Sequence, residues 1–110
     1  MKDWTNWKPM PAPDNCRKIE APEKAGVYQI RNKKTNQFIQ FGIGGECQKR
    51  MKTLYPQPHG TAGRNNQDKR NYILENWENL EYRTLVTDTR DEAKQIEDGI
   101  KAQSNHLFNT

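Results

Sequence analysis

Two short apolar runs on either side of a polar turn constrain the fold of this chain more than any other feature. The runs span residues 27–31 and 38–41, and residues 32–36 form the turn between them. β-Branched and aromatic residues flanking a short turn that contains Asn and Lys are typical of a β-hairpin. Glycines follow between residues 42 and 45, where they permit a sharp turn or a close approach of the backbone to another group. The sequence therefore predicts a hairpin that ends in a glycine-rich segment.

The remainder of the chain alternates between helical and strand signals. Residues 46–54 are good helix formers, and residues 56–66 form a long loop rich in Pro, Gly and Asn, the kind of loop that often carries function. A second helix is expected from Gln67, and residues 80–86 alternate as a half-buried strand does. Thr89 is expected to open a third helix, because Thr followed three residues later by Glu forms a capping box.

The composition bounds the size of the core. The chain has 110 residues, of which 32% are hydrophobic, so we expect one domain with a thin core. Residues 1–15 contain three prolines and no sustained period, which predicts an extended N-terminal arm ahead of a domain at 16–110. Trp4 and Trp7 on this arm either pack on the domain or stack on bases.

The apolar runs and the two cysteines of the sequence bear on its localisation and redox state. No apolar run approaches the roughly 18 residues of a membrane span, and no signal-peptide core follows Met1. We therefore expect a soluble cytoplasmic protein with no membrane partner. Cys16 and Cys47 form no CxxC pair, so free thiols are expected, with a single disulfide as the alternative.

The charge of the chain is segregated. The formal net charge is +4, with basic residues concentrated between 47 and 70 and acidic residues between 75 and 98. A basic segment suits a polyanionic partner such as nucleic acid, although a solvated surface with segregated charges is the alternative. The candidates for phosphate binding are Lys49, Lys52, Arg64, Lys69 and Arg70.

Several landmarks in the chain occur together in one known family. Gly26-Val27-Tyr28 is followed by Gln40-Phe41-Gly42, and Arg50 lies ten residues after Gln40. Glu97 lies four residues after Ala93, and Asn109 lies twelve residues after Glu97. In order and spacing this pattern resembles the GIY-YIG nuclease family, and the resemblance covers about residues 20–110.

The resemblance implies a fold and a reaction. The implied fold is a small α/β (α+β) domain with a three-stranded, mainly antiparallel sheet flanked by helices. The implied activity is cleavage of a DNA phosphodiester with one divalent metal, Mg²⁺ or Mn²⁺. Tyr28 would help to activate the attacking water, Arg50 would bind the scissile phosphate, Glu97 would hold the metal, and Asn109 would brace the site. A hard cation on one carboxylate and an always-charged guanidinium on the phosphate suit this chemistry.

The sequence departs from the family at two points. Gln40 replaces the second tyrosine of the family, and an amide cannot serve as a phenolate. The family also has a histidine or tyrosine four residues after its arginine, where this chain has Leu54. Tyr55, one residue on, and His59 in the loop are the candidates to replace it.

Each candidate also has a purely structural interpretation. Tyr28 in a strand is commonly a core residue, Glu97 can pair with Lys94 or Lys101, and Asn109 can be a simple cap. Three functions therefore stay open: a metal-dependent DNA endonuclease acting as monomer or homodimer, a nucleic-acid-binding module that has lost turnover, and a protein-interaction domain.

Overall fold

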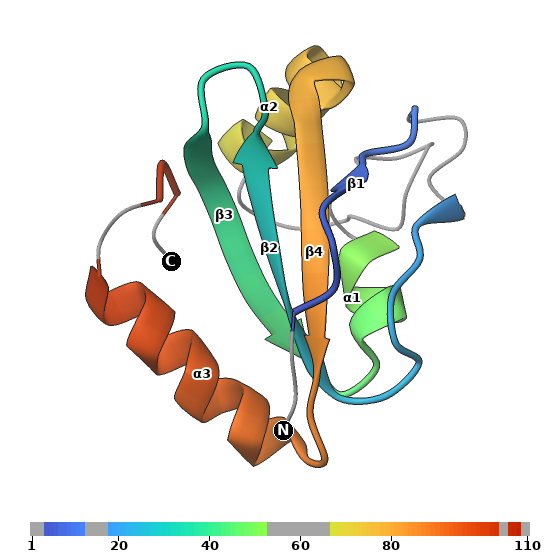
Figure 1. Cartoon of the computed structure of the whole chain (residues 1–110), viewed down its shortest axis with the longest axis vertical. Helices are drawn as coiled ribbons and strands as arrows, with labels where there is room; N and C mark the ends of the chain where they lie inside the picture. Colours follow the sequence, from blue (N-terminus) through green and yellow to red (C-terminus); the bar gives the residue numbers. More distant parts are fainter. Residues whose placement is uncertain (1–3, 13–17, 53–66, 104–105, 109–110) are drawn as a thin grey trace.

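An antiparallel sheet of four strands, in the order β1-β4-β2-β3, organises the chain. The computed structural model describes residues 4–12, 18–52, 67–103 and 106–108, with only the backbone described at 49, 50, 52 and 67–70. Helices cover both faces of the sheet (Figure 1), so the α+β class expected from the sequence is confirmed. The sheet has one strand more than the three expected, because the arm contributes the two-residue strand β1 (Lys8–Pro9).

The predicted hairpin consists of β2 (Gly26–Asn32) and β3 (Gln37–Gly44). The Asn32 side chain stabilises the turn, because its Oδ1 accepts hydrogen bonds from the backbone N–H groups of Lys34 and Thr35. Asn36 has a φ of 59°, the left-handed region that Asn tolerates better than most residues. The second strand is longer than expected, because the backbone stays extended and paired through Gly42 to Gly44 instead of turning.

The helices divide between the two faces of the sheet (Figure 1). α1 (Cys47–Lys52) and α2 (Gln67–Asn76), which continues into a short 3-10 turn, lie on one face. β4 (Leu80–Val86) follows, and α3 (Arg90–Gln103) packs on the other face. We call these the α1–α2 face and the α3 face. The predicted second and third helices and the strand at 80–86 are confirmed.

Alternation along the central strands gives each face its own apolar core. On the α1–α2 face, Tyr28 and Ile30 of β2 pack with Cys47 and Met51 of α1 and Ile73 of α2. On the α3 face, the core comprises Val27, Ile43, Leu85 and Ala93, with Ile96, Ile100 and Trp4 packed against it. Cys47 is a free, fully buried thiol. Burial raises its pKa to about 11, whereas Cys16 lies outside the described residues.

Segments from the two ends of the described chain run along β4 and β3. The arm runs along β4, where Thr5 N donates to Thr84 O at 2.9 Å and Met10 N donates to Leu80 O at 3.0 Å. Residues 106–108 run beside β3, where the N–H groups of Leu107 and Phe108 donate to Phe38 and Ile39. No helix in the described part of the chain is long and apolar enough to cross a membrane.

Candidate functional site

Tyr28 and Gly42, from the two landmark tripeptides, are in direct contact. They are partners in the β2–β3 pairing, and a Cβ atom built on Gly42 would lie only 2.6 Å from the Tyr28 hydroxyl oxygen. Glycine at 42 is therefore needed to make room for the tyrosine ring. The ring is 1% exposed and belongs to the core of the α1–α2 face. Packing therefore accounts for the presence of a tyrosine at 28 and a glycine at 42.

Gln40 lies on the same face as Tyr28, two residues before Gly42. It pairs with Ile30 across the hairpin and is 2% exposed. Its Nε2 has no hydrogen-bond partner among the described residues. A buried amide donor without an acceptor is costly. The position that the family fills with a phenol thus holds a buried hydrogen-bond donor in this chain.

α1 places Arg50 on the α1–α2 face of the sheet. The helix begins three residues after β3 ends, and its residues Cys47 and Met51 pack in the same core as Tyr28. The helix carries three basic residues and no acidic one. The described backbone thus brings the positions of Lys49, Arg50 and Lys52 on α1 and of Lys69 and Arg70 on α2 to one side of the sheet.

Four candidate residues lie outside the described part of the chain. Tyr55, His59 and Arg64 belong to the segment between α1 and α2, and Asn109 follows the segment beside β3. The roles inferred for these four residues stay predictions.

Glu97 belongs to α3, on the opposite face of the sheet from Tyr28. Its side chain is 18% exposed, and Lys94 Nζ donates to its Oε1 at 3.1 Å. Lys94 also pairs with the exposed Asp98 at 3.0 Å. The hydrogen bond to Asp98, and to a smaller extent the one to Glu97, raises the pKa of Lys94. The structural interpretation of Glu97, pairing with Lys94, is confirmed, and its role as a metal ligand stays a prediction.

The described residues therefore bring together one part of the expected site. Tyr28, Gly42 and Gln40 are neighbours on the face that α1 covers, and Glu97 is on the helix over the other face. Within the described ranges, no three His, Cys, Asp or Glu side chains are grouped so as to hold a metal ion. A single carboxylate that keeps Mg²⁺ with most of its waters needs no such group.

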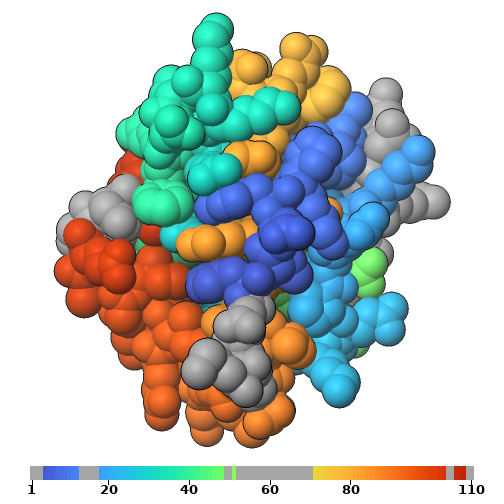
Figure 2. All heavy atoms as spheres, viewed as in Figure 1, coloured from blue at the N-terminus to red at the C-terminus, as the bar shows by residue number. Residues whose placement is uncertain are grey.

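Two tryptophans and two arginines form a stack that the sequence did not reveal. The Arg31 guanidinium lies 4.1 Å from the centre of the Trp7 ring, and that of Arg83 lies 4.6 Å from Trp7 and 4.5 Å from Trp4. Arg31 also pairs with Glu81. Burial and the neighbouring charge of Arg31 lower the pKa of Arg83. In Figure 2 the blue atoms of the arm alternate with orange atoms of β4 along the α3 face. Because arginines lie over their rings, Trp4 and Trp7 are packed on the domain. Of the two alternatives, packing on the domain or stacking on bases, the structure thus shows the first.

His106 is a second buried group that the sequence did not reveal. Its ring is 8% exposed and packs against Phe38 and Phe41, with centroid distances of 5.1 Å and 4.7 Å. Its Nε2 lies 3.1 Å from Nε2 of Gln29. Burial lowers the pKa of His106 to about 4, so the imidazole is neutral at physiological pH. No local sequence signal marks His106, because its partners come from β2 and β3.

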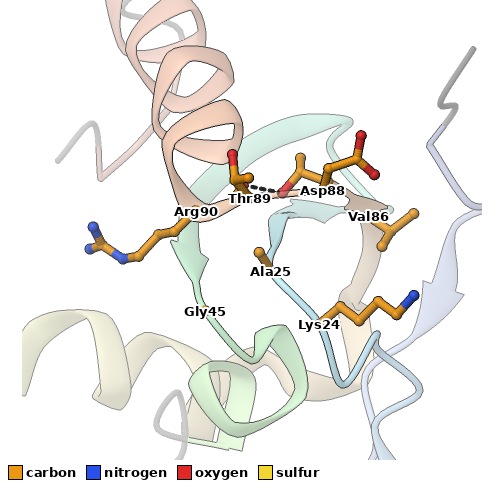
Figure 3. A pocket seen from close by; sticks show the side chains of 8 residues that line it. Lys24, Ala25, Gly45, Val86, Asp88, Thr89 and Arg90 are labelled. Carbon is orange, nitrogen blue, oxygen red and sulfur yellow. Dashed lines mark hydrogen bonds between the residues drawn. The ribbon is translucent and has the colours of Figure 1, made fainter.

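A cavity of about 550 Å³ opens at the end of the sheet where α3 begins. In Figure 3 the side chains of Lys24, Asp88 and Arg90 extend in different directions around it. The Thr87 hydroxyl at its wall donates to Thr89 O. The described lining is Lys24, Ala25, Gly45, Val86, Thr87, Asp88, Thr89 and Arg90, which includes none of the predicted site residues.

Comparison of the chain with protein-family models, curated proteins and solved structures gave no match. The fold and the site define an α+β domain with a four-stranded antiparallel sheet and a basic helix next to a buried tyrosine–glycine contact. The resemblance to the GIY-YIG nucleases rests on the sequence landmarks alone.

Proposed function

We propose that this chain is a nucleic-acid-binding domain with a GIY-YIG-like fold, and that it binds phosphates on the α1–α2 face. The observation that carries the proposal is α1, which has three cations and no acid and directly follows the hairpin with the landmark tripeptides. Cations clustered on one face attract a polyphosphate backbone and release its counterions. DNA is the proposed partner, and the cytoplasm the proposed location.

The second helix of this face adds to the same surface. Lys69 and Arg70 occupy the first turn of α2 together with the single acid Asp68, and Arg64 lies shortly before it in the sequence. α3, on the opposite face, carries the four acidic residues Asp91, Glu92, Glu97 and Asp98 against the three basic residues Arg90, Lys94 and Lys101. A DNA strand is therefore attracted more strongly to α1, which has no acid, than to α3.

Binding is the first proposal because the described residues favour it over hydrolysis. Gln40 lacks an ionisable phenol, Tyr28 fills the core, and Glu97 is held by Lys94 over the other face. A hydrolase must assemble its base, its phosphate-binding cation and its metal ligand around one phosphate. The landmarks fit a domain that keeps the phosphate-binding part of this set.

Matched lysine pairs test the binding face. Fluorescence anisotropy with labelled single- and double-stranded DNA, repeated over a range of salt concentrations, gives the affinity and its salt slope. Lys49→Gln/Lys52→Gln on α1 is expected to weaken binding and to reduce the slope by about 2. The control, Lys33→Gln/Lys34→Gln in the exposed hairpin turn, removes the same charge and should leave both values nearly unchanged. Equal effects of the two pairs, or no binding by the parent chain, would overturn the proposal.

Metal-dependent DNA cleavage is the second candidate function, and the order and spacing of the landmarks Tyr28, Arg50 and Glu97 in the sequence support it. In this function Glu97 would hold Mg²⁺ or Mn²⁺, Arg50 would bind the scissile phosphate, and Tyr28 would orient the attacking water. The metal would supply charge neutralisation on the phosphate and a more acidic water. The protein would act as a monomer or homodimer.

Cleavage of plasmid and single-stranded DNA in Mn²⁺ separates the two functions. The enzyme requires that the parent chain and Asp98→Ala cut DNA and that Glu97→Ala does not. Asp98 is the matched control, because it is on the same helix and pairs with the same Lys94. Salt-sensitive binding without cleavage leaves the binding function alone.

A further inference from the structure

A continuous line of contacts crosses the α3 face from the arm to the segment 106–108. It starts at Trp4 and Trp7, whose rings lie against the Arg83 guanidinium. Arg83 Nε donates to Gln29 Oε1 at 2.8 Å. The other end of the same Gln29 amide lies 3.1 Å from His106 Nε2. Residues about a hundred positions apart in the sequence are thus joined through two side chains of the central strands.

The chemistry of the donors fixes the direction of each hydrogen bond. A guanidinium can only donate, so the oxygen of the Gln29 amide must face Arg83 and its NH₂ group must face His106. An amide NH₂ group also only donates, so His106 Nε2 must accept. A neutral imidazole carries one proton, which this arrangement places on Nδ1, a buried nitrogen with no hydrogen-bond partner among the described residues.

His106 in turn holds the segment that follows it. Its backbone forms a parallel bridge with Phe38, and its ring packs between Phe38 and Phe41. The next two residues, Leu107 and Phe108, donate backbone hydrogen bonds to β3 at 3.0 Å and 2.8 Å. A shift of the His106 ring would therefore disturb the pairing of residues 106–108 with β3.

We propose that Arg83 and Gln29 form a relay through which the arm fixes the tautomer of His106 and holds residues 106–108 against β3. Trp4 and Trp7 confine the guanidinium, the guanidinium orients the amide, and the amide orients the imidazole. Displacement of the arm from the sheet thus loosens the segment at the far edge. The relay is independent of nucleic-acid binding and of catalysis.

The tautomer tests the inner half of the relay. Long-range ¹H–¹⁵N correlation spectra of the full chain distinguish the two ring nitrogens of each histidine, and His59→Gln identifies the signals of His106. The expected state is Nδ1–H with an unprotonated Nε2. In Gln29→Glu the carboxylate accepts from both neighbours, so the proton is expected to move to Nε2. An Nε2–H tautomer in the parent chain, or no change in Gln29→Glu, would overturn the relay.

Amide hydrogen exchange tests the outer half. Trp7→Ala is expected to speed exchange of the Leu107 and Phe108 amides roughly five- to tenfold relative to the Ile30 amide in the central strand. Trp7→Phe, a milder change, gives the same measurement if the alanine variant does not fold. The control is Lys8→Ala, an arm residue that bonds Glu20 instead of Arg83, and it should leave this ratio unchanged. Equal ratios in the tryptophan and lysine variants would contradict the coupling.

Discussion

At the scale of single residues, close packing accounts for the glycines of both landmark tripeptides. A Cβ on Gly26 would lie 2.8 Å from the Leu85 carbonyl oxygen, and a Cβ on Gly42 would meet the Tyr28 ring. Such contacts exclude every larger residue unless the backbone moves. The landmarks Gly26, Tyr28 and Gly42 therefore specify how three strands fit together. Packing thus explains these three landmarks without a catalytic role.

Substitution of Gly42 tests this packing. Gly42→Ala is expected to lower the free energy of unfolding by about 2–3 kcal/mol, because the added methyl group overlaps the Tyr28 ring. Gly45→Ala is the control, since nothing lies within 4 Å of a Cβ at that position, and it should change stability by less than about 0.5 kcal/mol. Urea denaturation measures both. Equal losses in the two variants would show that the Tyr28–Gly42 contact does not constrain residue 42.

His106 gives a pH dependence of known sign. Its pKa is about 4 in the folded protein and near the ordinary 6.5 when unfolded, so between these values the unfolded chain binds the additional proton. The free energy of unfolding should therefore fall as the pH drops from about 6.5 to 4, by roughly 2 kcal/mol. Stability curves measured by urea denaturation at several pH values test this. His106→Gln should flatten the slope in this window, and an unchanged slope would contradict the assignment.

At the scale of elements, α3 is the helix whose start is best defined. Thr89 Oγ1 accepts a hydrogen bond from Glu92 N at 3.1 Å, as the capping box in the sequence predicted. Asp91 and Glu92 add negative charge to the first turn, where the helix dipole favours it. Ala93, Ile96 and Ile100 then anchor the helix to the sheet.

Removal of the cap should weaken α3 measurably. Thr89→Ala is expected to reduce the free energy of unfolding by about 1 kcal/mol, because Glu92 N loses its acceptor. Thr89→Ser keeps the hydroxyl and should retain most of the stability. Thermal unfolding followed by circular dichroism distinguishes the two variants, and identical melting curves would mean that the cap contributes nothing.

The elements with local signals were predictable, and those that depend on pairing across the sheet were not. The hairpin, β4, α2 and α3 each have a turn, a cap or a period within their own residues. β1 and the segment 106–108 have none, because their hydrogen bonds go to strands more than sixty residues away. For the same reason the contacts of His106 with Gln29 and of Trp7 with Arg83 could not be predicted. The contact of Tyr28 with Gly42 could not be predicted from hairpin spacing either, because it depends on the register shift between Ile30 and Arg31. The position of Glu97 beside an apolar stripe was predictable from helical period, but not the sheet face that this stripe covers.

At the scale of the whole molecule, segments from both ends of the described chain pair with the sheet. The arm follows β4 from Thr84 to Leu80, and residues 106–108 follow the start of β3. Pro9 in β1 offers no N–H group for a further strand. The cover on β4 and on the start of β3 opposes the edge-to-edge pairing that leads to aggregation.

Removal of the arm should expose β4 and promote self-association. A chain that lacks residues 1–7 loses the hydrogen bond of Thr5 with Thr84 and both tryptophan rings. Lower stability is expected, together with a shift to larger species as the concentration rises, measured by sedimentation velocity. Lys8→Ala, which leaves the arm in place, should sediment as the parent chain does. A truncated chain that stays as monodisperse and stable as the parent would contradict this role of the arm.

The stack of alternating tryptophan and arginine side chains also determines how the domain would respond to mechanical force. A molecular motor pulling on the chain ahead of Trp4 would separate the arm from the sheet in steps. The Trp4 ring would leave the Arg83 guanidinium before the force reached the Trp7 ring. Unfolding under force would thus begin with the stepwise detachment of the arm at low force, and the hairpin of β2 and β3 would stay folded until the arm was detached.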